Sequence, residues 1–137
     1  MLDIENDVFE MVRATVSASR SDVLVLPEYT DTPSSLPCVT VEEADNQVVD
    51  RMRTERIENA AYIMYEVNVY SNKVGGKKSE AKEIANLVDE AFTSHGFTRI
   101  IKQQIPNLAN SKIHRIVARY RAVVGPNGQN RFLIYHS

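Results

Sequence analysis

The sequence predicts an α+β fold, a two-layer sandwich in which a mainly antiparallel sheet carries helices on one face. Two stretches place apolar residues at spacings of three and four, which is typical of amphipathic helices. Other apolar segments alternate with polar residues, as the strands of a half-buried sheet do. Because the order along the chain is helix, strands, helix, strands, and because 137 residues suit one domain, a single layered core is expected.

The first half of the chain is expected to contain one helix and two short strands. The helix covers residues 3–18, and a strand at residues 23–26 ends at a proline that precedes a turn-rich loop over 29–37. Residues 38–42 alternate as a second strand, and Asp45-Asn46 offers the turn that follows it. The apolar stripe of the helix consists of Ile4, Val8, Met11, Val12 and Val16.

The second half contains the clearest strand and the clearest helix. The strand covers residues 60–70, longer than the usual five or six residues, and part of it is expected to serve a neighbouring molecule. The helix ends at Gly96, because glycine readily adopts the left-handed conformation after a last helical turn. Strands over 97–105 and 112–124 follow and are expected to pair. The helical stripe consists of Ala81, Ile84, Ala85, Val88, Ala91 and Phe92.

One domain is expected to cover residues 1–137, with two peripheral segments. The polar residues 47–57 hold too few apolar side chains to anchor a buried face, so they are interpreted as a projecting arm or an interface strand. Residues 125–128, Gly-Pro-Asn-Gly, are a strong turn signal, and residues 132–135 are expected to return as a short strand. The segment 125–137 is therefore predicted to be a C-terminal hairpin.

The composition argues against several classes of protein. Sixteen Lys plus Arg against eighteen Asp plus Glu give a net charge of −2, which disfavours a bulk electrostatic binder of nucleic acid. The longest uncharged apolar run, residues 60–65, is far below the roughly 20 residues of a membrane span. Acidic residues near the start are unlike a secretory signal. Cys38 is the only cysteine, which excludes an intrachain disulfide and suits the reducing cytosol.

The residues that carry chemistry in enzymes give no consistent site. Residues 74–79 follow a strand and precede a helix, but their glycine spacing fails the phosphate-binding loop pattern. None of His95, His114 and His136 has a second His or Cys at a usual ligand spacing. Cys38 is interpreted as a buried structural thiol rather than a nucleophile. We therefore predict no catalytic residue, no metal site and no cofactor.

Arginine is the most suggestive residue type in the chain. Arginines 115, 119 and 121 fall on the strand side opposite the expected core, which predicts a cationic sheet face. Guanidinium groups suit the recognition of carboxylates, phosphates and protein interfaces. A solvent-exposed sheet side without a partner is an equally good interpretation. The candidate interface residues are Arg51, Arg53, Arg56, Arg115, Arg119 and Arg121.

Several blocks of sequence together resemble a known family. Residues 58–72 and 76–85 form the main block, and the shorter blocks are residues 88–92, 96–99 and 115–120. In this pattern of strand, helix, Gly-Phe and Arg-rich strand, the chain resembles the tail terminator, or tail completion, proteins of the neck of tailed bacteriophages and phage-like particles. The resemblance covers roughly residues 1–125.

This resemblance implies a structural virion protein without catalytic activity. Members of the family form a ring, usually a hexamer, that caps the tail tube, ends tail polymerisation and provides a surface for the filled head. The implied partners are copies of the chain, the tail tube protein and a head-tail connector or stopper protein. DNA would pass through the lumen without sequence-specific binding, and assembly would take place in the bacterial cytoplasm before the protein resides in the virion neck.

Two alternatives remain open from the sequence. The first is a head-tail connector, a stopper or another minor virion protein, which belongs to the same class. The second is a small α+β domain that binds a phosphorylated ligand through the turn at Gly75-Gly76-Lys77 or through the arginine face.

Overall fold

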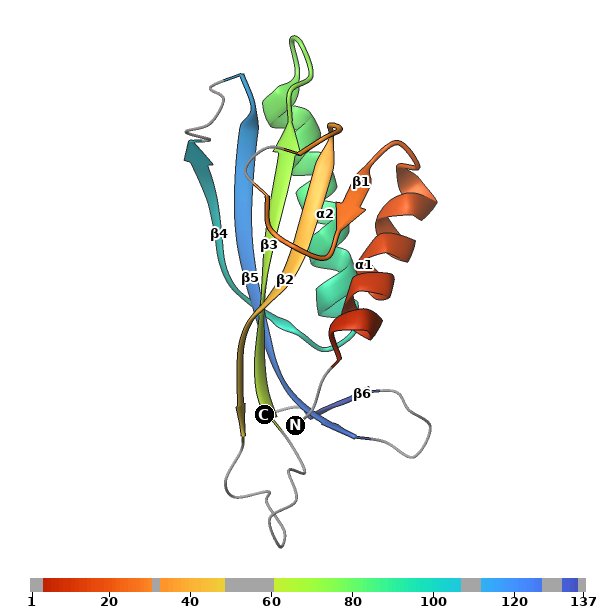
Figure 1. Cartoon of the computed structure of the whole chain (residues 1–137), viewed down its shortest axis with the longest axis vertical. Helices are drawn as coiled ribbons and strands as arrows, with labels where there is room; N and C mark the ends of the chain where they lie inside the picture. Colours follow the sequence, from red (N-terminus) through yellow and green to blue (C-terminus); the bar gives the residue numbers. More distant parts are fainter. Residues whose placement is uncertain (1–3, 31–32, 49–60, 107–111, 127–131, 136–137) are drawn as a thin grey trace, which may run out of the picture.

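The computed structural model describes residues 4–30, 33–48, 61–106, 112–126 and 132–135. It confirms the predicted α+β class, with a mainly antiparallel sheet and helices on one face (Figure 1). The sheet order is β1-β2-β3-β5-β4, and β6 pairs with β5; only the β1–β2 pair is parallel. The elements are α1 (Glu5–Ser19), β1 (Leu24–Leu26), β2 (Cys38–Val48), β3 (Ala61–Ser71), α2 (Lys77–Ser94), β4 (Thr98–Pro106), β5 (His114–Pro126) and β6 (Phe132–Tyr135).

The core lies between the sheet and the two helices. The predicted helical stripes face it, and α1 packs against β2 and α2 while α2 also packs against β3, β4 and β5. At its centre the rings of Phe92 and Tyr120 stack with centroids 4.3 Å apart and an interplanar angle of 2°. Tyr65 and Phe97 complete this aromatic cluster. The alternation of apolar residues in the strands therefore predicted which sheet face is buried.

One end of the opposite sheet face is covered by the described residues of the segment 27–37, which are residues 27–30 and 33–37. Tyr70 and Cys38 are fully buried there, and the Tyr70 hydroxyl donates a hydrogen bond of 2.7 Å to the backbone oxygen of Thr30. Burial raises the pKa of the Cys38 thiol to about 11, so the thiol stays protonated and unreactive. The expectation of a structural cysteine agrees with this environment.

The turn predicted at Asp45-Asn46 is wrong, because both residues lie inside β2. The ladder with β3 continues to Val48, and the register shifts between Glu43 and Asp45, which makes a β-bulge. The Asp45 carboxylate accepts hydrogen bonds of 2.9 Å from the Asn46 backbone N–H and from the Gln47 amide. Such local hydrogen bonds give these residue types their turn preference, but pairing with the long strand β3 decides the conformation here.

The two peripheral segments are only partly described. Gln47 and Val48 end β2, and the rest of the proposed arm at 47–57 lies outside the described residues. β6 pairs antiparallel with the last residues of β5. In Figure 1 the lower ends of β2, β3 and β5 extend beyond the helix layer. The 13 residues of β5 span roughly 40 Å at the usual rise of a strand.

The end of α2 has the geometry that its sequence predicts. Gly96 has a φ of 90°, and its N–H donates to the backbone oxygen of Thr93 while the N–H of Phe97 donates to that of Phe92. These two bonds define a Schellman motif, and the Phe92–Phe97 ring contact at 5.1 Å supplies its hydrophobic partner pair. The motif directs the chain from the helix into β4.

We expect Gly96→Ala to lower the free energy of unfolding by about 1 kcal/mol, because an L side chain is strained at this positive φ. Gly96→Asn should lower the free energy of unfolding by less, since asparagine tolerates the left-handed region better than alanine does. Urea unfolding followed by circular dichroism measures both changes. An alanine variant as stable as the wild type, or less damaging than asparagine, contradicts this account of the helix end.

Candidate functional site

The arginines predicted on the last long strand share the sheet face that points away from the helices. Register places Arg119 opposite Glu66 of β3 and Ile101 of β4, and Arg121 opposite Met64. We call the part of this surface below the segment 27–37 the open face. It is formed by Glu42, Asp45, Tyr62, Met64, Glu66, Arg119 and Arg121.

Arg115 has a structural environment rather than an exposed one. Its Nε donates a hydrogen bond of 2.9 Å to the Asn68 side-chain oxygen. Its guanidinium carbon lies 5.2 Å from the ring centroid of Tyr29 and 5.9 Å from that of Tyr70, within the range of a cation–π interaction. Because Tyr29 belongs to the covering segment and Tyr70 to β3, Arg115 holds that segment against the sheet.

Arg119 and Arg121 differ in their partners although both are exposed. Arg119 donates from Nε and Nη2 to one carboxylate oxygen of Glu66, at 3.1 and 2.9 Å. Arg121 has no ion pair among the residues that the structure describes. Since an exposed ion pair contributes little to stability, Arg119 can exchange Glu66 for another partner at a small cost in free energy. The guanidinium of Arg121 is exposed.

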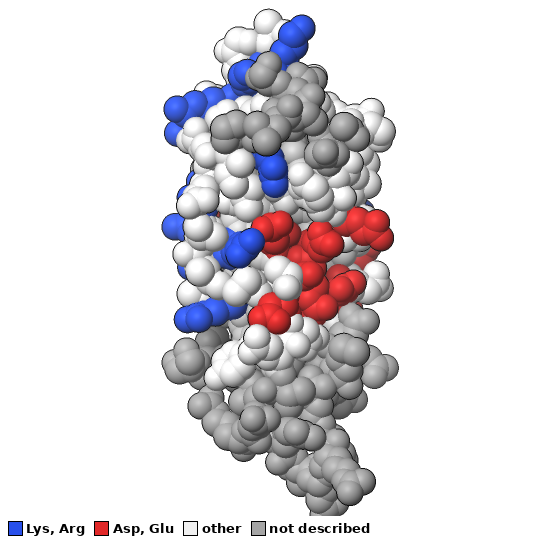
Figure 2. Space-filling model, turned by 60° about the vertical axis from the view of Figure 1, so that its left-hand side comes forward, with Lys and Arg blue, Asp and Glu red and all other residues white. Residues whose placement is uncertain are grey.

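The predicted cationic face is cationic only along β5. Glu42 of β2 lies directly opposite Glu66, and Asp45 lies one row further along the same surface. Figure 2 shows acidic side chains gathered in a band with basic side chains beside it. The alternation along β5 predicts the arginines of this face, but the acids belong to β2 and β3, and only strand pairing brings them to the same face.

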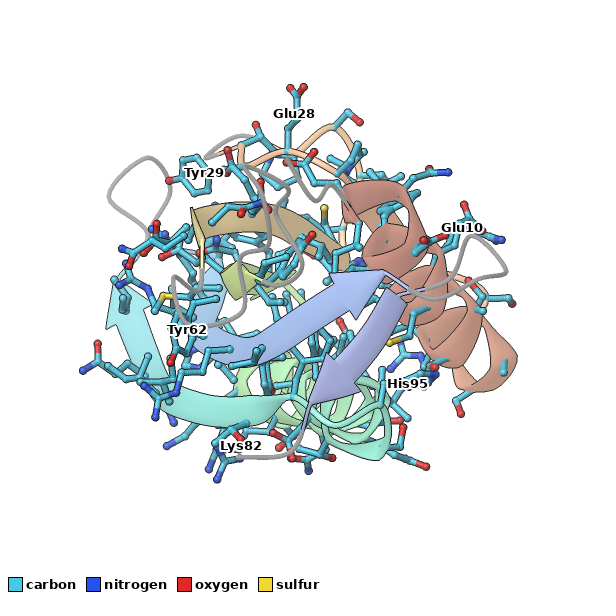
Figure 3. The ribbon with its side chains drawn as sticks, turned by 90° about the horizontal axis from the view of Figure 1, so that it is seen from below. Glu10, Glu28, Tyr29, Tyr62, Lys82 and His95 are labelled. Carbon is cyan, nitrogen blue, oxygen red and sulfur yellow. The ribbon has the colours of Figure 1, made fainter. Side chains whose placement is uncertain are left out.

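Tyr62, Met64 and Arg121 form an exposed patch of the residue types that dominate protein interfaces. Tyr62 is 45% exposed, and pairing places it beside Val123, one row from Arg121 (Figure 3). Tyrosine and arginine are enriched among residues that contribute most of the binding energy, and methionine is enriched at interfaces. The three remaining arginine candidates, Arg51, Arg53 and Arg56, lie outside the described residues.

The residues considered for ligand chemistry are separate from this patch. Residues 72–79 and Lys112 line a cavity of about 520 Å³ at the upper tip. His114 lies near the same tip, where burial and then the charges of nearby lysines lower its pKa. The His95 ring contacts the backbone oxygen of Ala91 at 2.8 Å. Within the described part of the chain, no three His, Cys, Asp or Glu side chains converge closely enough to hold a metal ion.

A buried carboxylate that the sequence analysis did not select lies between three elements. Glu80 of α2 is 9% exposed and accepts hydrogen bonds from Ser71, which ends β3, at 2.7 Å and from Arg20, which follows α1, at 3.0 Å. Burial raises its pKa, but the Ser71 hydroxyl and the Arg20 guanidinium outweigh that effect, so the pKa is lowered. The sequence feature that could have indicated the burial of Glu80 is its position one turn before Ile84, on the apolar stripe of α2.

A second cavity, of about 410 Å³, opens at the β2 side of the sheet. Its walls come from the first turns of α1, from β2 and from β3. Among the described residues, apolar side chains are combined with three carboxylates and no basic group. The lining residues are Glu5, Asn6, Asp7, Phe9, Pro27, Val41, Glu43 and Tyr65.

Comparisons with known proteins give a fold relationship. No family model matches the sequence, and no curated protein matches it. A chain of the virion of a native gene transfer agent particle is 18% identical to this chain, with a TM-score of 0.61 over 90% of this chain and 95% of that chain. At this identity the similarity shows a shared fold, in agreement with the fold that the family resemblance implies.

Two further solved structures are similar at a lower level. The sheath/tube terminator of the extracellular contractile injection system PVC, in its extended state, has a TM-score of 0.43 and 10% identity, over 100% of this chain and 62% of that chain. The bacteriophage SPP1 gp17 protein has a TM-score of 0.43 and 15% identity, over 93% of each chain. Neither α1 nor α2 has the length and apolar composition that crossing a bilayer requires.

Proposed function

We propose that this chain is a structural neck protein of a phage or phage-like particle. It forms a ring, in the family usually a hexamer, that caps the tail tube, ends tail polymerisation and provides the surface on which the head docks. The observation that carries the proposal is the fold shared with a chain of a gene transfer agent virion over nearly the full length of both. The sequence resemblance supports it independently.

The charge distribution is compatible with a ring through which DNA passes. The chain has a net charge of −2. Strong binding of phosphates would retard the passage of DNA, and an overall acidic chain disfavours such binding. In this proposal the partners are copies of the chain, the tail tube protein and the connector or stopper, and the protein assembles in the host cytoplasm before it resides in the virion.

Deletion of the gene from the parental particle tests the function. We expect tails of uncontrolled length that carry no head, because nothing ends tube growth or offers the docking surface. Negative-stain electron microscopy gives the length distribution, and the wild-type gene supplied in trans should restore it. Tails of normal length that fail to join heads would instead favour a connector or stopper. Deletion without effect on tail length or head joining would refute the proposal.

We propose the open-face patch around Arg121 as a contact with the tail tube. Arg121→Glu should weaken binding to purified tubes at least tenfold, because it reverses an exposed charge beside Tyr62 in a candidate hot spot. The matched control is Lys82→Glu on the exposed side of α2 (Figure 3). Cosedimentation with tubes measures binding, and melting curves of both variants should match the wild type. Equal loss in both variants, or in neither, contradicts this role.

A further inference from the structure

Two features on opposite sides of the sheet are complementary to each other. One is the cavity of about 410 Å³ beside β2, which we call the acidic cavity and define by Glu5, Asp7, Phe9, Val41, Glu43 and Tyr65. The other is a protrusion on β4, which we call the edge knob and define by Arg99, Ile100 and Lys102. Figure 3 shows β4 and α1 on opposite sides of the molecule.

The edge knob exists because β4 contains a bulge. The register with β5 shifts between Arg99 and Ile101, which leaves Ile100 without a partner on the neighbouring strand. Ile100 is 45% exposed, unusually high for isoleucine. Lys102 has no ion pair among the described residues, and Arg99 is exposed although it contacts Asp89 at 3.2 Å. The knob is thus an apolar side chain flanked by two basic ones.

The acidic cavity has the opposite character. Phe9, Val41 and Tyr65 give it apolar walls, and the carboxylates of Asp7 and Glu43 lie at its lining; none of the lining residues that the structure describes is basic. An apolar side chain flanked by cations matches such a site in shape and in charge. In shape and charge, the edge knob therefore fits the acidic cavity better than an anionic or a purely polar group does.

The knob cannot occupy the cavity of its own chain. Strands β3 and β5 lie between β2, which lines the cavity, and β4, which carries the knob; at about 4.8 Å per strand spacing, β2 and β4 are roughly 15 Å apart. The features nevertheless lie at one level, because Glu43, Tyr65, Tyr120 and Arg99 occupy successive positions of a single cross-strand row. Copies that are related by a rotation about an axis parallel to the strands meet at the same height along that axis. Two features at one level on opposite sides of the sheet can therefore touch between neighbouring copies.

We infer that the edge knob of one copy inserts into the acidic cavity of the next. This contact is heterologous, since two different surfaces meet, and repeated contacts of this kind close into a ring when the rotation permits. The bulge and the lysine on β4 disfavour direct strand-to-strand pairing at this level, so side chains rather than a continuous backbone ladder make the contact. The inference deepens the proposed function and rests on it for the ring.

Two single variants test the contact by blocking one side each. Ile100→Asp places a carboxylate on the knob, and Asn6→Trp fills the mouth of the cavity from an exposed helical position. Sedimentation velocity over a range of concentrations should show an assembly for the wild type and a monomer for each variant. Matched controls are Val74→Asp, at a residue that is 98% exposed, and Asn86→Trp, at an exposed position on α2; both should assemble as the wild type does.

Mixing the two variants distinguishes a heterologous contact from a symmetric one. The free knob of the Asn6→Trp chain should enter the free cavity of the Ile100→Asp chain, and both remaining surfaces are blocked. The expected product is a one-to-one dimer of twice 15.5 kDa that grows no further. Mixed chains that stay monomeric, or that assemble beyond a dimer, overturn the inference.

The outcomes separate this inference from the proposed function. If Ile100→Asp assembles and caps tubes as the wild type does, the knob contact is refuted while the neck function stands. A wild-type chain that is monomeric at all concentrations also refutes the contact. In that case the tail lengths of the deletion strain decide separately whether the neck function stands. If the variants and their mixture behave as expected but deletion leaves tails normal, the contact stands and the neck function fails.

Discussion

Replacing Phe92 by alanine is expected to lower the free energy of unfolding by about 3–5 kcal/mol, the range for removing a buried aromatic side chain. Phe92 is fully buried, stacks on Tyr120 and contacts Tyr65 and Phe97, so it joins α2 to three strands or strand ends at once. A typical domain has a stability of about 5–15 kcal/mol, so this loss removes a large fraction. If the chain forms the proposed ring, the variant should fail to assemble at temperatures where the wild type still does.

Urea unfolding monitored by circular dichroism checks this expectation. Phe92→Leu retains an apolar side chain and should lose less stability than Phe92→Ala, because only the ring contacts and part of the side-chain volume disappear. Leu87→Ala on the same helix is the matched control. Because Leu87 is only partly buried, this variant should lose less than half as much stability as Phe92→Ala. A Phe92→Ala variant that loses under about 1 kcal/mol would show that the aromatic cluster is not the centre of the core.

Neutralising Glu80 should destabilise the fold by about 1.5–3 kcal/mol near neutral pH, the range for hydrogen bonds to charged groups. Glu80→Gln keeps an acceptor for the Ser71 hydroxyl but loses the charge that Arg20 contacts at 3.0 Å. Arg20 is left with Asp22 and, at 3.6 Å, Glu83. Glu83→Gln, at an exposed carboxylate one turn away, is the control and should change stability by less than about 0.5 kcal/mol.

The same group gives a pH dependence with a defined sign. The folded chain holds the pKa of Glu80 below the ordinary carboxyl value of 4.5, so the unfolded chain binds the proton more readily. The stabilisation is fully present above that ordinary value and is lost as pH falls through the lowered one. The difference between wild type and Glu80→Gln, measured by urea unfolding from about pH 7 to about pH 3, should therefore shrink only below the ordinary value. A difference that grows on acidification contradicts this assignment.

Local periodicity was sufficient to predict most of the fold. The helix stripes, the core face of β3 and the helix end at Gly96 all depend on residues near one another in sequence, and each is found as expected. The prediction of a turn at Asp45-Asn46 was wrong because the conformation of these residues depends on pairing with β3, a strand that is distant in sequence. Pairing over many residues overrides the preference of a dipeptide.

The candidate site was less accessible to sequence analysis. The alternation along β5 correctly placed three arginines on one face, but it did not indicate that Arg115 is committed to Tyr29 and Tyr70 or that Glu66 neutralises Arg119. Those partners come from other elements. The acidic cavity and the edge knob were missed for the same reason, since one combines α1 with β2 and β3 and the other depends on a bulge.

The shielding of Cys38 has a consequence for the proposed assembly of identical chains. In such an assembly every copy brings another thiol, and a virion released from its host leaves a reducing environment for an oxidising one. Because this sulfur is enclosed beneath the segment 27–37 and remains protonated, it is protected from oxidation and from disulfide exchange with adjacent copies. Noncovalent contacts alone would then hold the proposed assembly, whatever redox conditions the virion meets outside the cell.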